Sequence, residues 1–205
     1  MGSEASLRLA LDPDNEIARL VLDAPPRNEM DRGFFHTLAA LVRTLKDLPV
    51  RGLVVHGAGR HFSSGADVDT LKIGLAGEQP ALAAHNLLEA TSSFQRIAEL
   101  PYPTVAAIGG CCLGSGLELA LACRWRVAAA NAVFALPETS FNLMPGCGGT
   151  VRLPALVGRG RAVELLLSGR FVDAEEAREI GLVDAVVDRR DLLPAARRLV
   201  ERVPA

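Results

Sequence analysis

One acidic side chain lies in a stretch of the chain that is otherwise small and apolar. In "AAIGGCCLGSGLELALACRW", residues 106–125, Glu118 is the one charge before Arg124. Burying an unpaired carboxylate is costly, because burial disfavours its charged form. Twenty residues further on, Glu138 stands between apolar residues in "ALPETSFNLMPGCGGT". Two carboxylates at one site can divide the work of catalysis, one ionised as a base and one protonated as an acid.

Two loops of small residues suggest a second chemical element. The loops are "SSGAD", residues 63–67, and "GGCCLGSG", residues 109–116. A loop without bulky side chains lets a ligand approach the backbone, and free N–H groups at the start of a helix suit a developing negative charge. Two such loops could direct two N–H groups at one oxygen. Each donor of such an oxyanion hole contributes roughly 3–4 kcal/mol of transition-state stabilisation.

Each of these signals also has a simpler explanation. Glu118 could be an ordinary carboxylate in the first turn of a helix, and Glu138 an exposed turn residue after a proline. The glycines could serve close packing of helix against strand. A further alternative makes Ser115 the nucleophile of a serine hydrolase, but none of the four histidines stands in a motif that places it beside Ser115: His36, His56, His61 and His85.

The elements that must position these residues alternate along the chain. Strands are expected at 17–22, 52–57, 104–108, 125–130, 132–136 and 182–187, and helices at 31–47, 80–100, 117–123, 148–158, 160–169, 173–181 and 192–203. Asp31 and Asp173 are expected as N-caps, and Gly181 as the residue that ends its helix. The alternation predicts an α/β fold with largely parallel, buried strands. Without a low-complexity linker, we expect a single domain over 1–205, with its core at about 7–187 and a short C-terminal helix in 188–205.

The composition excludes several classes of function. A formal charge of −2 and 4% aromatic residues argue against nucleic acid as a partner, and no apolar run is long enough to span a membrane. The cysteines fit no zinc pattern and are interpreted as small apolar fillers: Cys111, Cys112, Cys123 and Cys147. The expected location is a reducing cytoplasm.

Together these segments resemble the crotonase superfamily, the enoyl-CoA hydratase/isomerase family. The resemblance is carried by "HFSSGAD", by "AAIGGCCLGSGLELALACRWRVAAANAVFALPE" and by "NLMPGCGGTVRLPALVGRGRAVELLLSGRFVDAEEAREIGLVD". It implies a ClpP/crotonase-like spiral of ββα units, a homotrimer or hexamer, and stabilisation of a thioester enolate without a metal or redox cofactor. Its pattern makes Glu118 and Glu138 catalytic, Ala66 and Ser115 the oxyanion donors, and Gly146 a glycine that positions water. The residues expected to line the substrate path are Ser64, Gly65, Asp67, Val68 and Gly114.

The presence of both glutamates favours hydration of a 2-enoyl thioester in fatty acid metabolism, over isomerase or decarboxylase activity in the same family. Two departures from the family pattern qualify this expectation. Ser115 stands where a glycine is usual, which would be strained if that backbone required a positive φ. The chain also stops one helix after residue 187, where the family usually continues. A carrier-protein thioester in place of acyl-CoA, or a non-catalytic subunit that binds acyl thioesters, therefore remains an alternative.

Overall fold

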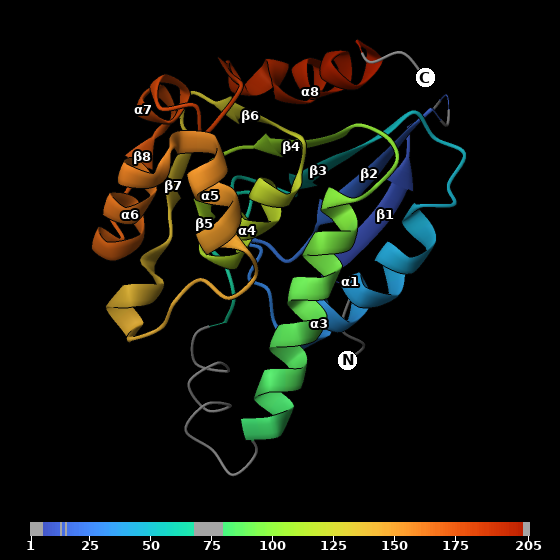
Figure 1. Cartoon of the computed structure of the whole chain (residues 1–205). Helices are drawn as coiled ribbons and strands as arrows, with labels where there is room; N and C mark the ends of the chain where they lie inside the picture. Colours follow the sequence, from blue (N-terminus) through green and yellow to red (C-terminus); the bar gives the residue numbers. More distant parts are fainter. Residues whose placement is uncertain (1–5, 13, 15, 68–79, 203–205) are drawn as a thin grey trace.

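A sheet of six strands, in the order β1-β2-β3-β4-β6-β9, forms the centre of the computed structural model (Figure 1). The structure describes residues 6–12, 14, 16–67 and 80–202, and the side chains of 80–86 lie outside this description. The strands are β1 (Leu7–Leu11), β2 (Ile17–Leu22), β3 (Gly52–Gly57), β4 (Thr104–Ile108), β6 (Trp125–Ala129) and β9 (Ala185–Val187). β1 pairs antiparallel with β2, and every other pair in this sheet is parallel. The predicted parallel α/β arrangement is confirmed.

Helices cover both faces of this sheet (Figure 1). On one face lie α1 (Arg32–Leu45), α3 (Pro80–Ala98) and α4 (Ser115–Ala122), and on the other lies α8 (Leu192–Glu201). Successive strand residues point to opposite faces, so Val55 of β3 joins the first core and Val54 joins the core under α8. Because both faces are covered, the central strands β3 and β4 are mostly apolar rather than alternating. None of the described helices combines the length and apolarity needed to cross a bilayer.

A second, smaller sheet contains three short strands. They are β5 (Cys111–Leu113), β7 (Val133–Ala135) and β8 (Val172–Asp173), in the order β5-β7-β8. Strands β1, β5 and β8 were not predicted, and the last two are too short to show a hydrophobic period. The remaining elements are the 3₁₀ turns η1 (Pro137–Phe141) and η2 (Arg189–Asp191) and the helices α5 (Gly149–Val157), α6 (Arg159–Ser168) and α7 (Ala174–Glu179).

The predicted helix caps are confirmed. Asp31 accepts a hydrogen bond from the amide of Phe34 at 2.7 Å, and Asp173 accepts one from the amide of Glu176 at 2.8 Å. Gly181 follows α7 with a φ of 78°. These side chains satisfy amides that have no partner within the first turn of a helix.

The parallel pairing of β3 and β4 brings the two small-residue loops to one edge of the sheet. Val55 lies opposite Ala106, so both strands end on the same side. Beyond the strands, the Ser63 amide donates to Cys111 O at 3.0 Å, and the Leu113 amide donates to Ser63 O at 3.0 Å. The loop after β3 and the loop after β4 are therefore joined side by side, as the site requires.

Candidate active site

The two loops approach most closely at Gly65. Its φ is 92°, and a Cβ built on it would lie 2.7 Å from Leu113 O and 3.4 Å from Ser115 N. A side chain at this position would push the loops apart, so the close approach requires glycine. Ala66 follows Gly65 directly, and its amide therefore lies near that of Ser115. Within the described part of the chain, neither of these two amides donates a hydrogen bond.

Ser115 does not carry the strain that its replacement of a glycine suggested. The positive φ falls one residue earlier, at Gly114, with φ 51° and ψ −127°. Ser115 itself is the first residue of α4 and has no positive φ. A serine is therefore compatible with this backbone, and its amide stands at the positive end of the α4 dipole.

A buried asparagine and a serine hold the loop that contains Gly65 and Ala66. The Ser63 hydroxyl accepts from the Gly65 amide at 3.0 Å and donates to Asn28 O at 2.7 Å. The Asn28 side chain, 1% exposed, donates to Ala58 O at 2.9 Å and to His61 O at 2.8 Å. Asn28 has a φ of 51°, which asparagine tolerates better than most residues. Sequence reasoning assigned no role to either residue, although "RNEM" places an asparagine in a turn.

Glu118 is almost completely buried and is bound by two backbone amides. It is 1% exposed, and its Oε1 accepts from the Cys147 amide at 2.7 Å and from the Gly149 amide at 2.8 Å. Burial raises the pKa of Glu118 above its ordinary value, and these two amides oppose that rise. The buried carboxylate is therefore not unpaired, because the loop before α5 supplies donors to its charged form.

Glu138 has a different environment. It lies on η1, and its Oε2 is buried with no hydrogen-bond partner among the described residues. Burial raises the pKa of Glu138 to about 7, and the charge on Glu118 adds to this rise. A hydrogen bond from the Glu138 backbone amide opposes this rise, but burial outweighs it and favours the protonated form of the carboxyl. Of the two glutamates, Glu138 is thus the one that holds a proton more readily.

Both glutamates lie at one site. Gly114 O accepts from the Glu118 amide at 3.0 Å, and a Cβ on Gly114 would lie 3.1 Å from Glu138 Oε1. The electrostatics of Cys147 reflect both groups. Burial raises the pKa of its thiol to about 12, and the charges of Glu118 and Glu138 add to this rise. The structure therefore brings together the two carboxyls and the two loops that the sequence singled out.

Gly146 lies beside this site, directly before Cys147. Its carbonyl accepts from the Thr91 hydroxyl at 2.9 Å, and a Cβ on it would lie 2.7 Å from Leu87 Cδ1. The amides that contact Glu118 belong to Cys147 and Gly149, to which the sequence analysis assigned no role in the site. The density of glycines in "GCGG" was the available signal. A role of the Gly146 amide in holding water stays a prediction.

The described residues that were predicted to line the substrate path belong to the same two loops. The Ser64 amide donates to Arg27 O at 2.9 Å, and its hydroxyl is buried without a partner among the described residues. The Asp67 amide donates to Met30 O at 3.2 Å. Val68 lies outside the described residues. Contact of these residues with a ligand stays a prediction.

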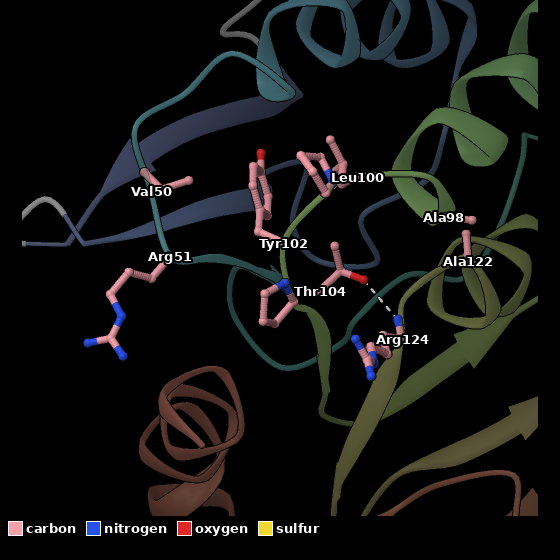
Figure 2. A pocket seen from close by; sticks show the side chains of 10 residues that line it. Val50, Arg51, Ala98, Leu100, Tyr102, Thr104, Ala122 and Arg124 are labelled. Atoms are coloured by element: carbon pink, nitrogen blue, oxygen red, sulfur yellow. Dashed lines mark hydrogen bonds between the residues drawn. The ribbon is translucent and has the colours of Figure 1, made fainter. Parts of the chain in front are cut away.

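A cavity of about 560 Å³ lies at the opposite end of the strands (Figure 2). It is lined by residues just before and at the start of β3 and β4, including Arg51, Tyr102 and Thr104. Figure 2 shows the hydrogen bond from the Arg124 amide to Thr104 Oγ1, which measures 2.8 Å. The carboxyls and small-residue loops are not part of its lining, so this cavity is separate from the candidate active site.

The described histidines do not form a triad with Ser115. His61 Nδ1 accepts from the Cys111 amide at 3.0 Å, and His56 Nδ1 lies 3.2 Å from Gly57 O. Among the side chains that the structure describes, no histidine is hydrogen-bonded to Ser115. The arrangement therefore favours chemistry by the glutamates over a serine nucleophile.

Comparisons with known proteins identify the family of this chain. The sequence profile of the enoyl-CoA hydratase/isomerase family matches residues 12–204. The fatty acid oxidation complex subunit alpha of Vibrio vulnificus is 40% identical over 209 aligned residues, which cover 98% of this chain. The chain spans only 29% of the length of that protein.

Solved structures show the same fold. An enoyl-CoA hydratase from Bacillus anthracis superposes with a TM-score of 0.86 at 33% identity, over 96% of this chain and 76% of that one. A Thermobifida fusca protein solved in complex with CoA gives 0.87 at 34% identity, over 98% and 80%. The chain has the crotonase fold and belongs to the enoyl-CoA hydratase/isomerase family.

Proposed function

We propose that this protein adds water across the double bond of a 2-enoyl thioester. The observation that carries the proposal is the unequal environment of two neighbouring carboxyls. Glu118 accepts two backbone hydrogen bonds, whereas Glu138 Oε2 has no partner in the described part of the chain. One group is thereby suited to act as a base and the other as an acid at neutral pH.

The free amides of Ala66 and Ser115 would hold the thioester oxygen. Attack at the β-carbon of an enoyl thioester moves negative charge to this oxygen. Two fixed N–H groups stabilise that charge without reorganisation, by roughly 3–4 kcal/mol for each donor. The joined loops after β3 and β4 support this role, because Gly65 lies against the peptide before Ser115.

The two glutamates would then complete the addition. Glu118 takes a proton from water as the oxygen bonds to the β-carbon, and protonated Glu138 gives its proton to the α-carbon. The product is a 3-hydroxyacyl thioester, and proton exchange with solvent restores both carboxyls. Because the groups are close, their two protonation steps belong to the pair rather than to either residue. The reverse reaction, loss of water, uses the same groups.

The family and a related complex support the proposed substrate class. The related Thermobifida fusca protein was solved with CoA, which supports an acyl-CoA as the thioester. Ser64, Gly65, Asp67, Val68 and Gly114 are the proposed lining of its path. A homotrimer or hexamer in the cytoplasm is the assembly we propose. No metal or redox cofactor has a role in this mechanism.

Crotonyl-CoA provides the test. Hydration removes the conjugated-thioester absorbance, and we expect decay with the wild-type protein and its loss in Glu118→Gln and Glu138→Gln variants that remain folded. Turnover of a 3-enoyl-CoA without hydration would assign the protein as an isomerase. Release of free thiol that stops in Ser115→Ala would instead indicate a hydrolase. CoA binding without any turnover would indicate a binding subunit.

A further inference from the structure

The loop that binds Glu118 is itself held by an arginine. Arg152 of α5 donates from Nη1 to Cys147 O at 2.9 Å, on the same residue whose amide donates to Glu118. Its Nη2 donates to Gln95 Oε1 of α3 at 2.7 Å. The guanidinium thus connects α3 to the Cys147–Gly148 peptide, which lies between the two amides that bind Glu118.

The loop wraps closely around this guanidinium. Gly148 has a φ of 102°, and a Cβ on it would lie 2.0 Å from Arg152 Nη1. Gly148 O in turn accepts from the Arg152 amide at 2.9 Å. The side chain of Arg152 therefore fixes the Cys147–Gly148 peptide, and its backbone amide fixes the Gly148–Gly149 peptide, whose N–H binds Glu118.

A second tie fixes the beginning of the same loop. The Thr91 hydroxyl of α3 donates to Gly146 O at 2.9 Å. Gln95, one helical turn further along α3, also donates to Glu99 at 2.7 Å, which fixes its orientation toward Arg152. The loop is therefore anchored to α3 at two points, and only the Arg152 anchor brings a positive charge.

The charge of Arg152 acts on Glu118 as well. Among the groups that face this carboxyl are the Glu138 carboxyl from η1, the Cys147 thiol from the loop and the Arg152 cation from α5. Burial raises the pKa of Glu118, and the Arg152 cation, like the two amides, opposes the rise. Glu99, directly after α3, accepts a hydrogen bond from the Gln95 side chain.

We propose that Arg152 is a positioning residue for Glu118: by binding Cys147 O and Gln95 together, it holds the 147–149 loop so that its amides contact the carboxylate. This inference rests on the proposed hydration reaction for its kinetic consequence. A planar guanidinium can make both hydrogen bonds at once, whereas the single ammonium group of a lysine has no such fork. Arg152 touches neither water nor thioester in this scheme and acts through Glu118.

Three variants test the inference. Arg152→Met removes charge and hydrogen bonds, Arg152→Lys keeps the charge, and Arg159→Met is the control, at an exposed arginine that begins the neighbouring helix α6. With crotonyl-CoA, we expect kcat of Arg152→Met to fall roughly 10- to 100-fold, as for a slightly misplaced catalytic group, with KM changed less than about threefold. The acidic limb of its pH profile should move to higher pH, because loss of a cation favours the protonated acid. Arg152→Lys should return the acidic limb of the pH profile to its wild-type position, but it should not restore the full kcat.

A second readout does not depend on activity. Carbon-13 NMR of the glutamate side-chain carboxyls, with the Glu118 signal assigned by Glu118→Gln, should show a higher titration midpoint in Arg152→Met than in wild type or Arg159→Met. An Arg152→Met protein that titrates and turns over like Arg159→Met would overturn the inference. If Arg152→Met does not fold, Arg152→Lys decides the question. A wild-type kcat in Arg152→Lys would overturn the inference, and a lowered kcat with an unchanged acidic limb of the pH profile would support it. A wild-type protein without hydratase activity would contradict the proposed function, while the NMR comparison would still decide the role of Arg152.

Discussion

The amide nitrogen of Gly149 lies 2.8 Å from Oε1 of Glu118. A Cβ at Gly149 would lie 3.0 Å from this oxygen and 3.1 Å from Pro145 Cβ. The glycine therefore has two functions at once: its amide binds the carboxylate, and its lack of a side chain lets the carboxylate come near enough.

A methyl group at Gly149 should displace Glu118. We expect Gly149→Ala to lower kcat for crotonyl-CoA hydration by roughly 10- to 100-fold, because small displacements of a catalytic group have effects of that size. Gly160→Ala is the matched control: Gly160 also lies in the first turn of a helix, but a Cβ there meets nothing within 4 Å. Steady-state kinetics of both variants check this, and equal kcat values would show that the contact does not constrain the carboxylate.

Gly65→Ala should damage both stability and activity. The new side chain would need a φ of 92° and would lie 2.7 Å from Leu113 O. We expect a loss of about 1–3 kcal/mol in the free energy of unfolding, with a larger fall in kcat than the stability loss explains. Gly59→Ala separates the two causes, because Gly59 has a φ of 71° but its nearest neighbour would be 4.0 Å away. Denaturant unfolding should rank Gly65→Ala below Gly59→Ala, and the reverse order would contradict the close approach of the loops.

The rate should depend on the protonation of Glu138. Its pKa is raised to about 7, chiefly by burial, and the mechanism needs its protonated form. We therefore expect kcat/KM for hydration to fall as the pH rises through about 7, provided that Glu118 remains ionised there. The measurement is a pH profile with crotonyl-CoA. A profile that keeps rising above pH 8 would exclude Glu138 as the acid in the free enzyme.

The same raised pKa predicts an effect on stability. Between the ordinary glutamate value and about 7, the folded protein retains a proton at Glu138 that the unfolded chain has lost, so stability falls as the pH rises through this range. Glu138→Gln removes this dependence. Its melting temperature relative to wild type should therefore be higher at pH 8 than at pH 5. Glu179→Gln, at an exposed glutamate of α7, should show no such difference, and equal behaviour of the two variants would contradict the buried state of Glu138.

The sequence predicted the fold, and it singled out the two glutamates and the two loops that the structure brings together, because short, strong signals indicated them. These signals are local features of the sequence: buried strands, the Asp31 and Asp173 caps, and the spacing of the two glutamates. The family resemblance indicated how they combine in one fold and one site. The donors to Glu118 could not be predicted in the same way. The Cys147 and Gly149 amides come from a loop about 30 residues later, and backbone groups leave no residue type to recognise.

Arg152 and Asn28 are two residues whose roles could not be predicted from the sequence. Neither residue type is unusual for its segment of the sequence. The role of each depends on the acceptor oxygens that the fold brings near its side chain. Arg152 reaches Gln95, 57 positions earlier, and Asn28 reaches His61 O, 33 positions later. Such links follow from tertiary packing and became visible only with the structure. The placement of the positive φ at Gly114 rather than Ser115 is a third example.

Product analysis in isotopically labelled water tests the account most directly. After incubation with crotonyl-CoA in H₂¹⁸O, mass spectrometry should find ¹⁸O in a 3-hydroxybutyryl-CoA formed by the wild-type protein. The initial rate of this product should fall at least about 10²-fold in Glu118→Gln and in Glu138→Gln. Absence of the labelled product with wild type, or its formation at the wild-type rate by either glutamine variant, would contradict the assignment of the two carboxyls as base and acid.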